Sequence, residues 1–113
     1  KNVKDSTASE GDLILMLFDG PIRFADQAIN CINDSDIAGA HDKLVRAQDI
    51  MLELISSLNM DVGEIAQNLY QLYSFINQLL IQANVKKDGD LIQQAIKLLT
   101  ELREMWHEVV DKV

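Results

Sequence analysis

A glutamate and a histidine stand three residues apart in Glu104-Met105-Trp106-His107, a spacing that lets both side chains reach one metal ion from a helix. In a helical bundle a di-metal centre needs two such pairs and two further carboxylates, because each metal takes several ligands from facing helices. The sequence holds one such pair only, and His41 has no glutamate three residues before it. We therefore expect no metal site and no metal-dependent oxidase activity.

Cys31 is the only cysteine, so an internal disulfide is excluded. It lies in an apolar segment without a C-x-x-C partner, a pattern typical of a buried core cysteine. The acidic pairs at 34/36 and 88/90 fall in polar turns, where carboxylates cap helices. The sequence has no glycine-rich phosphate loop. We expect a protein that is not an enzyme and that binds no cofactor.

Length and charge limit the class of protein further. A chain of 113 residues with 48% hydrophobic residues fits a single domain, 1–113, with one core. The formal charge of -8 and the scattered Lys and Arg residues disfavour nucleic acid, and no apolar run approaches the roughly 20 residues that cross a membrane. We expect a cytoplasmic protein without membrane insertion. Because the chain begins with Lys1 rather than Met, we also expect that a short N-terminal segment precedes it.

Four segments carry the periodicity of a helix face, with apolar residues recurring every three or four positions. They cover about 10–33, 37–58, 63–87 and 89–110 and are joined by short polar turns. Core-facing positions are predicted in the second segment at Ile37, Ala40, Leu44, Ala47, Met51, Leu54 and Leu58, and in the third at Ile65, Leu69, Leu72, Ile76, Leu79 and Ala83. Short turns send each helix back along its predecessor. The pattern predicts an all-α, antiparallel, up-down-up-down four-helix bundle.

The first segment carries two local signals. Ser9 is placed to cap its first turn, with Asp12 three residues later. Pro21 cannot donate a hydrogen bond to the carbonyl of Leu17, and its ring crowds that turn, which costs about 3 kcal/mol in a regular helix. A bend at this point is expected, and a break is the alternative.

A second set of apolar side chains remains once the core-facing positions are assigned. Monomeric proteins seldom expose connected apolar patches of more than a few hundred Å², so the surplus indicates a partner. The candidate partner-binding residues are Ile14, Phe18, Ile22, Ile29, Val45, Arg46, Ile55, Tyr73, Leu80, Ile81, Asn84 and Ile96. The alternative is that these residues widen the core stripe; it is favoured for Tyr73 and balanced for Ile14, Phe18, Ile22 and Ile96.

Two polar members of this set have structural alternatives. Arg46 is expected to pair with Asp49 on its helix surface, as Arg23 is with Asp19, or to hold a peptide carbonyl. Asn84 lies near a helix end, where asparagine commonly bonds the local backbone.

Short motifs follow one another along the predicted helices. They are TAS at 7–9, MLFDG at 16–20, IRF at 22–24, RAQDI at 46–50, LY at 72–73, QANVKKD at 82–88, and LL at 98–99 followed by Leu102-Arg103 and Trp106. In this order and spacing they resemble the FliS family of flagellin export chaperones, in which an aromatic residue precedes Asp-Gly. Phe18 has that position here. The family usually has a small residue where this chain has Pro21, so the resemblance leaves the groove shape near Ile22 open.

The resemblance implies a cytoplasmic chaperone that binds the disordered C-terminal segment of flagellin. Such a chaperone prevents premature polymerisation and delivers its client to components of the flagellar export apparatus. In the family, aromatic residues of the N-terminal tail can cover the empty groove. The alternative is a small helical adaptor or self-associating bundle without a flagellin client. We expect a monomer or a weak homodimer.

Overall fold

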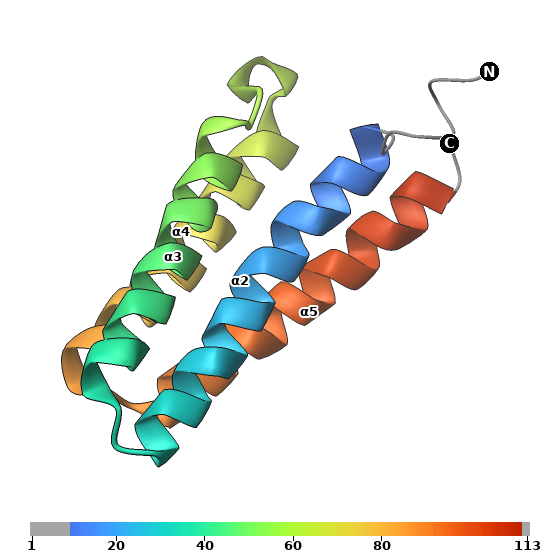
Figure 1. The fold of residues 1–113 in the computed structure, drawn as a ribbon. Helices are drawn as coiled ribbons and strands as arrows, with labels where there is room; N and C mark the ends of the chain where they lie inside the picture. The colour runs from blue at the N-terminus through green and yellow to red at the C-terminus, as the bar shows by residue number, and fades with distance from the viewer. Residues whose placement is uncertain (1–9, 112–113) are drawn as a thin grey trace.

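The computed structural model describes residues 10–111, and this part of the chain folds into four α-helices and one short 3-10 helix (Figure 1). The α-helices are α2 (Glu10–Asn33), α3 (Ile37–Ser56), α4 (Glu64–Lys86) and α5 (Gly89–Asp111), and the 3-10 helix η1 (Met60–Val62) lies between α3 and α4. Each α-helix contacts the next along the chain, and α5 also contacts α2. The predicted all-α, up-down-up-down four-helix bundle is confirmed for the described residues.

Local hydrogen bonds explain where α3 and α5 begin. The carboxylate of Asp36 accepts from the backbone N–H of Gly39 at 2.9 Å, and the carboxylate of Asp88 accepts from the backbone N–H of Asp90 at 2.9 Å. Both bonds satisfy N–H groups that a first helical turn leaves without partners. The expected cap Ser9 lies outside the described residues.

The ends of α3 and α4 differ slightly from those expected. α3 ends at Ser56 rather than at 58, because the chain turns there into η1. α4 starts after Gly63, whose φ of 92° is a conformation that favours glycine. It ends at Lys86, where Lys87 adopts the left-handed conformation with φ of 52°.

Pro21 lies inside α2, which runs without a break from Glu10 to Asn33. Pro21 is fully buried, so its ring contributes to the core at the point where the helix loses one hydrogen bond. Next to it, a Cβ on Gly20 would lie 2.8 Å from Cδ1 of Ile50. The glycine therefore lets α2 and α3 approach closely.

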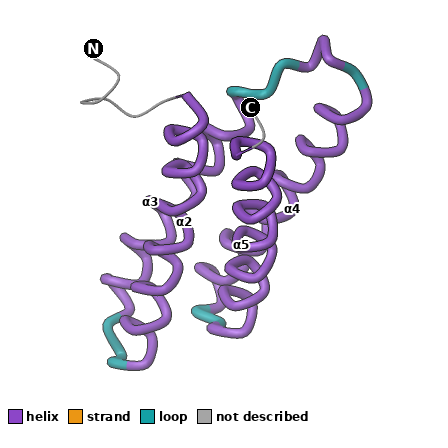
Figure 2. The backbone as a smooth tube through the Cα atoms, turned by 90° about the vertical axis from the view of Figure 1, so that its right-hand side faces the viewer, coloured by secondary structure: helices purple, strands orange, loops and turns teal. Residues whose placement is uncertain are grey.

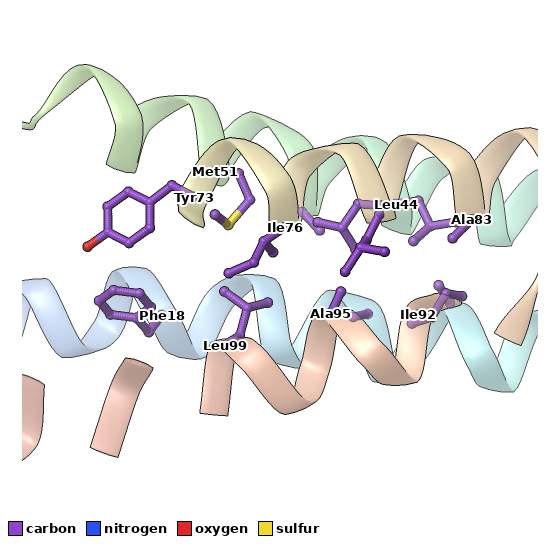
Figure 3. Close-up of a cluster of buried hydrophobic side chains, with 14 of the residues drawn as sticks. Phe18, Leu44, Met51, Tyr73, Ile76, Ala83, Ile92, Ala95 and Leu99 are labelled. Atoms are coloured by element: carbon purple, nitrogen blue, oxygen red, sulfur yellow. The ribbon is translucent and has the colours of Figure 1, made fainter. Parts of the chain in front are cut away.

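The core runs along the bundle axis and takes side chains from all four helices (Figure 3). Its largest fully buried members are Phe18, Leu44, Met51, Ile76, Leu80, Ile92, Leu99 and Pro21. Most of the predicted core-facing positions of α3 and α4 are buried or half-buried. Ile37 and Ile65 are exceptions, because they lie in the first turns of their helices and are exposed.

The two ends of the bundle differ. Figure 2 shows the loops around η1 at one end and two short turns at the other. In Figure 1, α2 lies beside α5 and α3 beside α4, and the two pairs diverge toward the end that carries η1. At that end the apolar side chains of Met60, Val62 and Ile65 are exposed.

Candidate functional site

A cleft of about 260 Å³ opens at the η1 end of the bundle. We call it the end cleft. Its lining residues are Ile14, Leu17, Leu54, Ser57, Leu58, Asn59, Val62, Ile65, Ala66, Leu69, Tyr73 and Trp106. They come from all four α-helices and η1, and most are apolar. Such a lining suits an apolar guest held by few polar contacts.

The connection from α3 to α4 forms one wall of the end cleft. Ser57 donates its hydroxyl to the carbonyl oxygen of Leu54 at 2.7 Å, which ends α3. The side-chain oxygen of Asn59 then accepts from the backbone N–H of Asp61 at 3.0 Å and starts η1. Polar groups of this wall therefore bond within the connection and leave mainly apolar atoms toward the cleft.

Two aromatic side chains, Tyr73 and Trp106, line the end cleft, and Phe18 packs against Tyr73 in the core. The indole N–H of Trp106 donates to the hydroxyl oxygen of Tyr73 at 3.2 Å, which links α5 to α4. The ring of Tyr73 meets that of Phe18 edge to face, with centroids 6.0 Å apart. Burial raises the pKa of the Tyr73 hydroxyl above its ordinary value, and the hydrogen bond from Trp106 opposes that rise.

The rim of the end cleft is apolar and faces solvent. Val62 in η1 is 60% exposed and Ile65 in the first turn of α4 is 65% exposed. Met60 in the same connection is also exposed. Exposed apolar side chains beside a preformed apolar cleft are typical of a surface that binds a partner.

The candidate residues do not gather in one place. Ile14 and Tyr73 line the end cleft. Ile22, Ile29, Ile55 and Ile96 are half-buried and pack against the core, and Val45 and Ile81 are also half-buried.

Phe18, Tyr73 and Leu80 belong to the core, which was the favoured alternative for Tyr73 and one of two balanced alternatives for Phe18. Phe18 and Leu80 are 0% exposed and Tyr73 is 2% exposed. Phe18 and Leu80 point into the bundle on the buried faces of α2 and α4, so neither is accessible in this arrangement. The small exposed part of Tyr73 lies in the end cleft, which Tyr73 helps to line.

The ion pairs on the surface also differ from those expected. Asp19 pairs with Arg103 of α5 rather than with Arg23, because its position on α2 faces α5. That contact raises the pKa of Arg103. Arg46 pairs with Asp42 at 3.1 Å, four residues earlier on α3, rather than with Asp49. An acid four residues before a base is the favoured order on a helix.

Asn84 joins two helices through its side chain. Its amide nitrogen lies 2.9 Å from Nδ1 of His41 on α3, and its side-chain oxygen accepts from Nζ of Lys87 at 2.9 Å. These bonds lie at the opposite end of the bundle from the end cleft. Asn84 therefore has a structural role in this arrangement.

Several cleft-lining residues were assigned to the core from the sequence. Leu54, Leu58, Ile65 and Leu69 continue the core-facing pattern of α3 and α4, and this periodicity does not show where the facing helices diverge. Met60 and Val62 lie in the turn between the second and third predicted helices. Two apolar residues in a turn were the available signal.

Three other kinds of feature could carry a function between residues 10 and 111: a metal site, a membrane-spanning helix and an accessible cysteine. Between residues 10 and 111, no three His, Cys, Asp or Glu side chains lie close enough together to hold a metal ion. No helix in the same range is long and apolar enough to span a membrane. Cys31 is half-buried, and its pKa is raised chiefly by burial.

Comparison with known proteins matches the amino-acid sequence to a family. The sequence profile described as "Flagellar protein FliS" matches residues 1–113. The chain is 30% identical to the flagellar secretion chaperone FliS of Bacillus subtilis (strain 168), over 94% of this chain and 79% of that protein. It is 33% identical to the flagellar secretion chaperone FliS of Vibrio cholerae, over 92% of this chain and 77% of that protein. A protein of the same name from Campylobacter jejuni is 37% identical to this chain, over 86% of this chain and 77% of that protein. The chain therefore belongs to the FliS family of flagellar proteins.

Proposed function

We propose that this protein is a cytoplasmic export chaperone that binds the disordered C-terminal segment of flagellin. It prevents premature polymerisation of flagellin and hands it to components of the flagellar export apparatus, without covalent chemistry and without a cofactor. The observation that carries the proposal is the end cleft with its exposed apolar rim. Membership of a family whose relatives are named flagellar secretion chaperones supports it.

The size of the end cleft suits side chains of a folding peptide. An apolar cavity of roughly 150 Å³ accepts a benzene ring, and the end cleft offers about 260 Å³. A large apolar side chain of the client can therefore enter, with part of its main chain. A disordered segment that folds onto such a surface exchanges its conformational entropy for buried apolar area.

The proposed contacts begin at the end cleft and extend along the helices. Ile14, Val62 and Ile65 would contact the client first, because Ile14 lines the cleft and the other two form its rim. The half-buried members of the candidate set would extend the contact as Ile22, Ile29, Val45, Ile55, Ile81 and Ile96. A bound segment would then follow grooves between helices, as amphipathic helices do.

Calorimetry with a peptide from the C-terminal segment of flagellin tests the proposal. We expect micromolar or tighter binding with a negative heat-capacity change and weak salt dependence. Ile65→Asp should weaken binding roughly tenfold or more, because it places a charge on the apolar rim. Phe75→Asp is the matched control, since Phe75 is 54% exposed on the same helix and does not line the end cleft.

The control variant should bind as the unmodified protein does, and both variants should keep their helical circular dichroism. Absence of binding at micromolar concentrations would reject the proposal. Sedimentation separates it from the adaptor alternative. A one-to-one complex with the peptide supports the chaperone, whereas a stable dimer that ignores the peptide supports a self-associating bundle.

A further inference from the structure

Tyr73 lines the end cleft, and two contacts fix its side chain. Its ring is held edge to face by Phe18, and its oxygen accepts the indole N–H of Trp106 at 3.2 Å. In Figure 3 this hydroxyl points away from the other labelled side chains and along the bundle axis. A phenol that accepts one hydrogen bond still has its own proton to donate.

Other polar groups of the end cleft are already engaged. The hydroxyl of Ser57 donates to the carbonyl oxygen of Leu54, and the N–H of Trp106 donates to Tyr73. The side-chain oxygen of Asn59 accepts from the backbone N–H of Asp61, and Asn59 is an exposed residue rather than a buried one. Within the described lining, Tyr73 therefore supplies the buried donor without an acceptor in the protein.

A peptide that enters an apolar cleft brings main-chain carbonyls with it. Carbonyls in the last turn of a helix, or in an extended stretch, have no partner within the helix, and burying them unpaired is unfavourable. A carboxylate is a poorer candidate for this position, because no Lys or Arg is among the residues that line the end cleft. The Tyr73 hydroxyl is therefore better suited to donate to a neutral carbonyl oxygen than to a carboxylate.

We propose that Tyr73 donates a hydrogen bond to one main-chain carbonyl of the bound flagellin segment and thereby fixes the register of that segment in the end cleft. This inference rests on the proposed function. Apolar contacts alone would let the client slide by one side chain, whereas a single directed donor favours the position in which a free carbonyl reaches it. Trp106 acts as a positioning residue, because it orients the hydroxyl without touching the client's carbonyl.

Calorimetry on Tyr73→Phe, which keeps the ring and its contact with Phe18, tests the role of the hydroxyl. We expect binding of the flagellin peptide about tenfold weaker than that of the unmodified protein. Tyr70→Phe is the matched control, since Tyr70 is exposed on the same helix and is not among the lining residues. It should bind normally. Trp106→Phe should give a smaller loss than Tyr73→Phe, because the donor remains.

A series of peptides with single amide-to-ester replacements provides a second measurement that does not depend on a variant folding. An ester carbonyl is a weaker acceptor, so one position should weaken binding to the unmodified protein. That loss should disappear in Tyr73→Phe, which gives a coupling between the two changes.

The outcomes separate the two proposals. A peptide that fails to bind the unmodified protein rejects the proposed function. A peptide that binds the unmodified protein and Tyr73→Phe equally, or whose ester losses are the same in both proteins, overturns the role of Tyr73 and leaves the chaperone function standing.

Discussion

The substitution Phe18→Ala distinguishes a core role for Phe18 from direct contact with a client. Phe18 is 0% exposed and packs edge to face against Tyr73. Truncating a buried phenylalanine to alanine costs about 3–5 kcal/mol, because apolar burial is lost and a cavity remains. The contact between the two rings contributes roughly 0.5–1.5 kcal/mol of that amount.

Phe75→Ala is the matched control, because it removes the same atoms from a side chain that is 54% exposed. Full burial of a phenylalanine contributes about 1.5–3 kcal/mol, so less than half of that, roughly 1 kcal/mol, is expected at Phe75. Domains are stable by only about 5–15 kcal/mol. Phe18→Ala therefore removes a large share of the stability, whereas Phe75→Ala does not.

Urea unfolding followed by circular dichroism at 222 nm measures both changes. We expect the Phe18→Ala transition at a much lower urea concentration with an unchanged slope. In a thermal scan, the loss corresponds to roughly 12–25 °C in Tm for a domain of this size. Equal costs at Phe18 and Phe75, or a cost below about 1 kcal/mol at Phe18, would refute the assignment of Phe18 to the core.

Three further predictions concern an ion pair, a glycine and a titrating side chain. Arg103→Met should cost about 0.5–1 kcal/mol through loss of the partly exposed pair with Asp19, and a double-mutant cycle in urea should show this coupling shrinking in 1 M salt. Gly63→Ala should cost about 1–2 kcal/mol because φ is 92° there, whereas Gly89→Ala, which has open space around its Cβ, should be close to neutral; an equal cost would contradict this reason. Because burial raises the pKa of Tyr73 in the folded state, its contribution to stability should be complete below about pH 10 and should be lost as the pH rises through the raised pKa. Above about pH 10, the unfolding free energy of Tyr73→Phe should therefore fall less steeply with pH than that of the unmodified protein, and parallel curves would refute the burial of this hydroxyl.

The bundle was predictable from the sequence because helix periodicity is a local property. The core-facing pattern of α3, from Ala40 to Leu54, could be derived from spacing alone, and these residues are buried. How deeply an apolar side chain is buried was less predictable. Phe18 and Leu80 look like surplus apolar residues in the sequence, yet they lie in the centre of the core, because spacing identifies a face and not the distance to the facing helix.

Pro21 shows a second limit of sequence reasoning. The expected cost of a proline in a helix left a bend and a break both open. α2 remains continuous through Pro21, and full burial of the ring contributes apolar contacts that offset the missing hydrogen bond. This compensation depends on packing between helices, which the sequence of one helix does not contain.

The end cleft lies where the apolar pattern of α3 and α4 continues into residues that the other helices do not cover. Leu58, Val62 and Ile65 continue the apolar pattern of α3 and α4 into the connection between them, while α2 and α5 diverge from that pair. Stability alone would favour polar residues or larger core side chains at this end, because uncovered apolar surface contributes nothing to folding. Under the proposed function, the client segment would supply the missing cover. On this proposal, the residues that weaken the end of the bundle are the ones that would form the binding surface. Substitutions that fill the end cleft with larger core side chains should then stabilise the bundle and weaken binding of the flagellin segment.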